Sequence, residues 1–164
     1  MKSPFSFAML TLLCFSGAQA TFTEADKQRA VSLHNNHRSS VMPSASNMKS
    51  IEWDEGLATA AQQLADSCKF EHNRAGQNIY EGSDATDLLK QAIEAWHNEQ
   101  KDYNYDSNTC SPNAVCGHYT QVVWADSSKV GMGVSRRCEN GMYIVVANYD
   151  PVGNYAGEKP YRQR

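Results

Sequence analysis

At residues 117–124 the chain reads GHYTQVVW, directly after Cys116. This stretch sets His118 among aromatic and β-branched side chains. A histidine in such a setting is either a buried structural group or a ligand in a cleft, and which of the two it is decides most of what can be said about function. Residues 118–124 fit a short helix as well as a strand, because propensity does not separate the two here.

The first twenty residues are typical of a secretory signal peptide. Lys2 provides a basic start, residues 5–15 form an apolar run too short to span a bilayer, and residues 18–20 (AQA) fit the small-x-small cleavage rule. We therefore expect residues 1–20 to be removed, leaving a secreted, extracellular chain. No second apolar run approaches the length of a transmembrane helix, so residues 21–164 are expected to form a single domain with its own core.

The charge of the chain excludes some partners. The full sequence has 15 basic and 18 acidic residues; without Lys2, 14 basic residues remain and the net charge is about −4. This value argues against a general nucleic-acid-binding protein and against a polybasic membrane anchor. It leaves binding of an uncharged lipid open.

Four cysteines remain after the signal peptide: Cys68, Cys110, Cys116 and Cys138. An even number in a secreted chain indicates two disulfides, and the sequence leaves three pairings open. Zinc ligation is the alternative. It is disfavoured because no CxxC pair is present and the compartment is oxidising.

Start and stop signals predict the first of three helices before residue 100, and helical spacing of apolar residues predicts the other two. The first starts at Thr23 and runs to about residue 41, ahead of Pro43. Asp54 is expected to cap the second helix, which should carry Cys68 into the interior. Asp84 is expected to cap the third helix.

The end of the third helix carries an acidic residue on its apolar side. Glu99 follows Trp96 by three positions, so it continues the buried face, and a carboxylate there needs a partner. Further on, residues 129–137 and 142–150 read as two strands joined by a turn at residues 139–141 (ENG). Three helices followed by a hairpin indicate one α+β domain.

Several motifs together resemble the CAP superfamily of cysteine-rich secretory proteins, antigen 5 and group 1 pathogenesis-related proteins. Residues 117–124 look like its first signature, and residues 148–155 (NYDPVGNY) resemble the second. Residues 33–38, 76–79 and 103–105 fall in the expected order, and the sequence GEKPY at residues 157–161 is closest to the pathogenesis-related branch. The resemblance implies a three-layer α-β-α sandwich with a central antiparallel sheet, and it places His118 on a helix.

The same resemblance implies the disulfide pairing Cys68–Cys138 and Cys110–Cys116. Related sequences often have a further bridge at the positions of Met132 and Ala147, which this chain lacks. We expect Met132 and Ala147 to fill that space as an apolar pair, with some loss of stability.

The resemblance also implies a cleft lined by two histidines and two acids. The histidines correspond to His72 and His118 and one acid to Glu99, whereas Gln77 replaces the other acid. Two neutral imidazoles could bind zinc or a similar divalent cation, with Glu99 as a weaker ligand or as a general base. An amide such as that of Gln77 is a poor zinc ligand and accepts no proton at neutral pH, so the alternative is a satisfied polar network among these four side chains.

Other candidates have structural interpretations. His34 and His37 are expected to pack and to form hydrogen bonds on the first helix, and His97 is expected to face solvent. A set of aromatic residues either lines a hydrophobic groove or packs in the core and loops: Tyr103, Tyr105, Tyr119 and Trp124.

Three functions follow from the resemblance and the residues. The first is a non-enzymatic secreted binding module with a defence, venom or signalling role, a sterol or fatty-acid ligand, an unknown protein receptor and no required cofactor. The second is a divalent-metal-dependent hydrolase or protease that uses His72, Glu99 and His118. The third is a structural extracellular protein. Gln77 favours the first and the third, and no serine or cysteine nucleophile motif supports catalysis.

Overall fold

A computed structural model describes residues 20–164, so the expected signal peptide lies almost entirely outside the described residues. The described chain forms these elements: α1 (Glu24–Ser39), β1 (Glu52–Trp53), α2 (Glu55–Asp66), β2 (Gln77–Gly82), α3 (Leu88–Asn98), the 3₁₀ helix η1 (Glu99–Asp102), β3 (Tyr103–Asn104), β4 (Thr109–Cys110), α4 (Gly117–Val122), β5 (Lys129–Val134) and β6 (Tyr143–Asp150).

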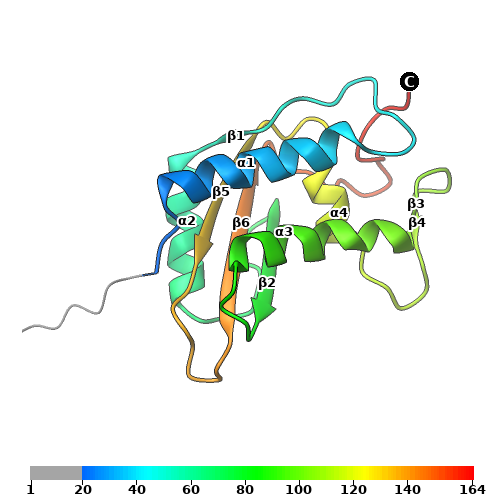
Figure 1. The fold of residues 1–164 in the computed structure, drawn as a ribbon. Helices are drawn as coiled ribbons and strands as arrows, with labels where there is room; N and C mark the ends of the chain where they lie inside the picture. Colours follow the sequence, from blue (N-terminus) through cyan, green and yellow to red (C-terminus); the bar gives the residue numbers. More distant parts are fainter. Residues whose placement is uncertain (1–19) are drawn as a thin grey trace, which may run out of the picture.

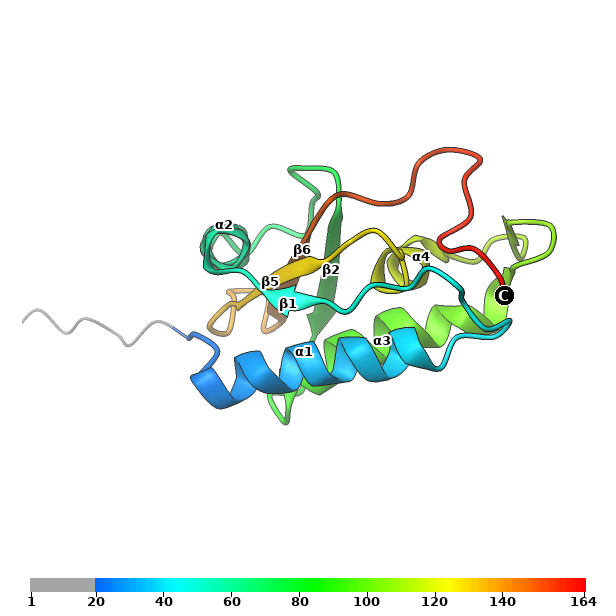
Figure 2. The same ribbon diagram turned by 90° about the horizontal axis from the view of Figure 1, so that it is seen from above.

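The elements are arranged in three layers. The central sheet has the strand order β1-β5-β6-β2; its pairs are antiparallel except for the short β1, which runs parallel to β5. α2 covers one face, and α1 and α3 lie side by side on the other (Figures 1 and 2). The expected α-β-α sandwich with a central antiparallel sheet is therefore confirmed.

Alternation along β6 builds the two halves of the core. Ile144 and Val146 pack with the α2 side chains, whereas Val145, Ala147 and Tyr149 belong to the cluster beneath α1 and α3. All five are completely buried. This period of two is what a strand between two helical layers requires.

The helix starts agree with the expected caps at two of three positions. Thr23 forms a capping box with Asp26, and Asp54 accepts from the backbone N–H of Leu57. The third prediction was wrong. Asp84 accepts instead from the N–H of Thr86, two residues on, and Asp87 caps α3 through the N–H of Lys90. Both aspartates can cap, and the sequence alone did not separate them.

Other boundaries also differ from the expectation. α1 ends at Ser39, and β5 ends at Val134, so the β5–β6 connection is longer than a tight two-residue hairpin. Gly141 turns the chain there with a φ of 82°. Cys68 lies beyond the end of α2 and is only half-buried rather than carried into the interior.

Two glycines of β5 let α2 approach the strand backbone. A Cβ atom on Gly131 would lie 2.1 Å from the backbone nitrogen of Ala58, and one on Gly133 would lie 2.4 Å from backbone atoms of Gln62. No side chain fits at either position while α2 stays in place.

Two disulfides tie the connections to this frame. Cys68–Cys138 joins the end of α2 to the β5–β6 connection, and Cys110–Cys116 links β4 to the start of α4. These are the two pairs that the family resemblance implied. Where a further bridge is missing, Met132 and Ala147 lie directly opposite each other on β5 and β6, and both are buried.

Candidate functional site

The side chain of Glu99 links the end of α3 to the start of α4. Its Oε2 accepts from the backbone N–H groups of His118 and Tyr119 at 3.0 and 3.1 Å, and its Oε1 lies 2.7 Å from Nδ1 of His118. The N-cap residue of α4, Cys116, makes no side-chain capping bond. Glu99 therefore accepts hydrogen bonds from N–H groups that the helix leaves free. These contacts supply the partner that a carboxylate at this position was expected to need.

This contact also orients the imidazole of His118. Because Nδ1 faces a carboxylate, Nε2 is the ring nitrogen left to meet a ligand. The backbone of His118 is held as well, since its carbonyl oxygen accepts from Nδ2 of Asn78 at 3.0 Å. A helix of only six residues thus presents one histidine in a fixed direction.

Gln77 is built into the sheet instead of facing a reaction centre. It begins β2 and is 7% exposed. Its amide nitrogen donates to the side-chain oxygens of Asn73 and Asn148, at 3.0 and 2.8 Å, and its oxygen accepts from the N–H of Asn73 at 3.2 Å. Both ends of the amide are therefore used in contacts with other parts of the fold.

His72 completes the expected set from an exposed position. Its ring centroid lies 6.3 Å from that of His118 at an interplanar angle of 29°. The fold thus brings His72, Glu99 and His118 to one region. Gln77 makes no hydrogen bond to these three residues in the described part of the chain: all hydrogen bonds of its side chain go to asparagines.

Comparison with known proteins agrees with the fold and with the family resemblance. The model of the cysteine-rich secretory protein family, CAP, matches residues 31–149. The chain belongs to this family. The CAP protein is 38% identical over 164 residues to the pathogenesis-related protein PR-1 type of Sambucus nigra, which covers 96% of this chain and 95% of that one.

The chain is also similar to a human protein and to a solved structure. The CAP protein is 39% identical over 166 residues to peptidase inhibitor 16 of Homo sapiens; the match covers 94% of this chain but 36% of that protein, so this chain spans about a third of it. Among solved structures, the crystal structure of NaASP2 with Zn²⁺ superposes with a TM-score of 0.73 at 28% identity, over 87% of each chain. In the described part of the CAP protein, no helix is long and apolar enough to cross a membrane.

His34 has the structural role that its position on the first helix predicted. It is completely buried; its Nδ1 donates to the carbonyl of Ala30 at 2.8 Å, and its Nε2 accepts from the hydroxyl of Tyr149 at 2.8 Å. Burial lowers the pKa of His34 to about 4, so its ring is neutral at physiological pH.

Arg38 joins α1 to the segment after α4. Its guanidinium is buried and has five backbone carbonyl acceptors: those of Lys49, Val122, Trp124, Ala125 and Ser127. Burial lowers the pKa of Arg38 to about 10, still well above neutral. The arginine in the family motif on this helix is therefore a structural cation.

The aromatic residues do not form one groove. Tyr103 packs on Tyr119, with ring centroids 5.7 Å apart, and Tyr105 stacks on Tyr161 at 4.8 Å. Trp124 is 5% exposed and lies in the core. The packing interpretation accounts for these contacts.

A second group of candidate ligands was not expected from the sequence. Among the described residues, one set of three histidine, cysteine or acidic side chains has ligand atoms within 4.8 Å of one another, and it consists of His37, Glu94 and His97. The prediction for His97 was wrong: it is half-buried and stacks on His37 instead of facing solvent. Glu94 was missed, although its spacing of three from His97 places both on one face of α3.

Proposed function

We propose that this CAP protein is a secreted, extracellular binding module without catalytic activity. The observation that carries this proposal is that Glu99 and Gln77 are both engaged in holding the fold. The carboxylate of Glu99 caps α4 and holds His118, and the amide of Gln77 bridges two asparagines. General acid–base catalysis needs a group that exchanges protons with the substrate, and an amide does not.

The ligand that we propose is a sterol or a fatty acid. A cavity of about 390 Å³ opens between the start of α1, β1 and α2. Phe22, Trp53 and Met132 supply apolar surface, and Lys27 and Asp66 are among its polar lining residues. An apolar cavity of this size with a few polar groups suits a ligand with a hydrophobic body and one polar end. A role in defence, venom or signalling, and a protein receptor, belong to the same proposal.

Binding is tested by titrating the purified protein with radiolabelled cholesterol and palmitate. We expect saturable binding of at least one of them. Thr59 is exposed and lines the cavity, so Thr59→Trp should block it and reduce binding. Ala60→Trp is the matched control because the neighbouring residue lines a different hollow on α2. Absence of saturable binding, or equal binding by both variants, contradicts the proposed ligand.

The alternative function is hydrolysis assisted by a divalent cation between His72 and His118. The zinc in the NaASP2 structure is the observation in its favour. A casein or peptide assay with and without added zinc separates the two functions. We expect no turnover in either condition. Zinc-dependent turnover that is lost in His118→Ala but kept in His37→Ala would establish the hydrolase instead.

A further inference from the structure

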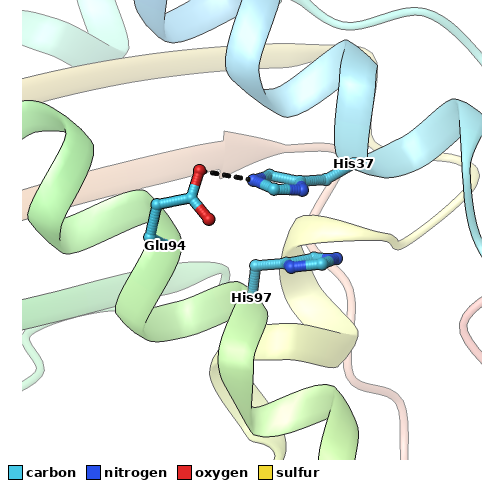
Figure 3. A group of neighbouring side chains, drawn as sticks. All are labelled: His37, Glu94 and His97. Atoms are coloured by element: carbon cyan, nitrogen blue, oxygen red, sulfur yellow. Dashed lines mark hydrogen bonds and ion pairs between the residues drawn. The ribbon is translucent and has the colours of Figure 1, made fainter.

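The helices α1 and α3 meet at a cluster of two histidines and one glutamate. His37 extends from the last turn of α1 toward Glu94 and His97 of α3, and Figure 3 shows the three side chains facing one another. Nε2 of His37 lies 3.1 Å from Oε1 of Glu94. The rings of His37 and His97 are stacked, with centroids 3.7 Å apart and an interplanar angle of 17°.

The three side chains offer a ligand set suited to one metal ion. One ligand atom from each residue lies within 4.8 Å of the other two. Ligand atoms around tetrahedral zinc, at about 2.0–2.2 Å from the metal, are roughly 3.4 Å apart. Side-chain rotations that draw the most distant atoms together by at most about 1.4 Å would close the site. Glu94 and His97 are already on one helical face, in the Glu-x-x-His spacing that helical bundles use for metal ligation.

The contacts of His97 leave a ring nitrogen for a metal. Within the described residues, the His97 ring contacts other rings, His37 and the edge of Tyr119, and donates or accepts no side-chain hydrogen bond. All three residues are half-buried, which leaves room for a water molecule as a fourth ligand.

We propose that His37, Glu94 and His97 bind a divalent transition-metal ion, with zinc as the best fit, and that this ion fastens α1 to α3. Two imidazoles and one carboxylate favour zinc and its neighbours in the first transition series. Calcium and magnesium are disfavoured because they prefer oxygen ligands. The site uses none of His72, Glu99 and His118, and it is independent of the proposed lipid ligand.

The test is a titration of metal-stripped protein with Zn²⁺ by calorimetry, and with Co²⁺ followed by its d–d absorption. We expect one ion bound per chain in His72→Ala/His118→Ala, the control variant that lacks the cleft histidines. His97→Ala and Glu94→Gln in that background should each weaken binding at least about tenfold. Glu94→Gln keeps the shape of the side chain, so loss of binding there reports the carboxylate and not the fold.

Thermal unfolding gives a second readout. Saturating zinc should raise the Tm of the control variant by about 5 °C and leave the Tm of its Glu94→Gln derivative unchanged. Circular dichroism of each metal-free variant checks that it is folded, and His37→Gln replaces any alanine variant that is not. Binding that disappears in His72→Ala/His118→Ala but survives in His97→Ala would overturn the proposal, as would no binding by the wild-type protein.

Discussion

The carboxylate of Glu99 holds both the imidazole and the backbone N–H of His118. One oxygen lies 2.7 Å from Nδ1 of the ring, and the other accepts from the main chain of α4. The same side chain therefore fixes the position of the helix and the orientation of the histidine on it. Removing this side chain should therefore lower the stability of the fold, whether or not a ligand is bound.

Replacing Glu99 tests this. Glu99→Ala leaves two N–H groups of α4 and Nδ1 of His118 without an acceptor, and we expect a loss of about 2 kcal/mol or more in the free energy of unfolding. Urea denaturation measures it. Glu139→Ala removes an exposed carboxylate and serves as the control, with an expected change within about 0.5 kcal/mol. Equal stability of the two variants would contradict the capping role.

Arg38 is predicted to resist conservative replacement. A lysine has three donors on a single atom and cannot reach the five carbonyls that the guanidinium contacts. Arg38→Lys should therefore lower the free energy of unfolding by about 3 kcal/mol or more, since buried carbonyls lose their donors. The control is Arg29→Lys on the same helix. Arg29 is more exposed, so its replacement should change the free energy of unfolding only slightly.

His34 should make stability fall in mild acid. Its pKa is about 4 in the folded protein and about 6.5 in the unfolded chain, so the unfolded state binds the proton more readily. The contribution is complete above pH 6.5 and is lost as the pH falls toward 4. Between pH 7 and pH 5, protonation of His34 alone should lower the free energy of unfolding by about 2 kcal/mol.

Unfolding in urea at both pH values, for the wild type and for His34→Gln, isolates the contribution of His34. The variant starts from lower stability because the bond to Tyr149 is disturbed, but its decrease between the two pH values should be smaller by about 2 kcal/mol. The same pH dependence in both proteins would assign the effect to other groups.

The strand pair at Met132 and Ala147 should accept a disulfide. The two residues are direct partners on β5 and β6, and directly opposed residues in antiparallel strands have Cα atoms about 4.5–5.5 Å apart, a separation that a disulfide spans. Met132→Cys/Ala147→Cys should form a bridge when oxidised. The bridge should add about 3 kcal/mol to the free energy of unfolding, from which the loss of methionine packing is subtracted. Thermal unfolding of the oxidised and reduced double variant measures the difference. A higher Tm in the reduced form would contradict the prediction.

Much of the fold was accessible from the sequence because its signals are local. Start and stop signals placed α1, apolar spacing placed α2 and α3, and the turn signal at residues 139–141 placed β5 and β6. The family signatures supplied the sheet arrangement and the helical position of His118. One prediction failed because two neighbouring residues offered the same chemistry. Asp84 and Asp87 can each cap a helix, and only the packed chain selects between them.

The candidate site was predictable in its members but not in their contacts. The resemblance identified His72, Gln77, Glu99 and His118, yet it did not show that Asn73 and Asn148 take up the amide of Gln77. The group formed by His37, Glu94 and His97 could not be found from one helix alone, because it requires α1 and α3 to lie side by side (Figure 2). The spacing of Glu94 and His97 was the only local signal.

The close approach of α2 to β5 restricts how this protein can be engineered or diversified. In a library of all single substitutions, Gly131 and Gly133 should tolerate no replacement, since even a methyl group collides with the backbone of a neighbouring helix. Met132, between them, faces the opposite layer and should accept other apolar residues of similar volume. Positions that tolerate substitution would therefore alternate along β5 with positions that do not. The intolerant positions would identify the face of the sheet that has no space for side chains.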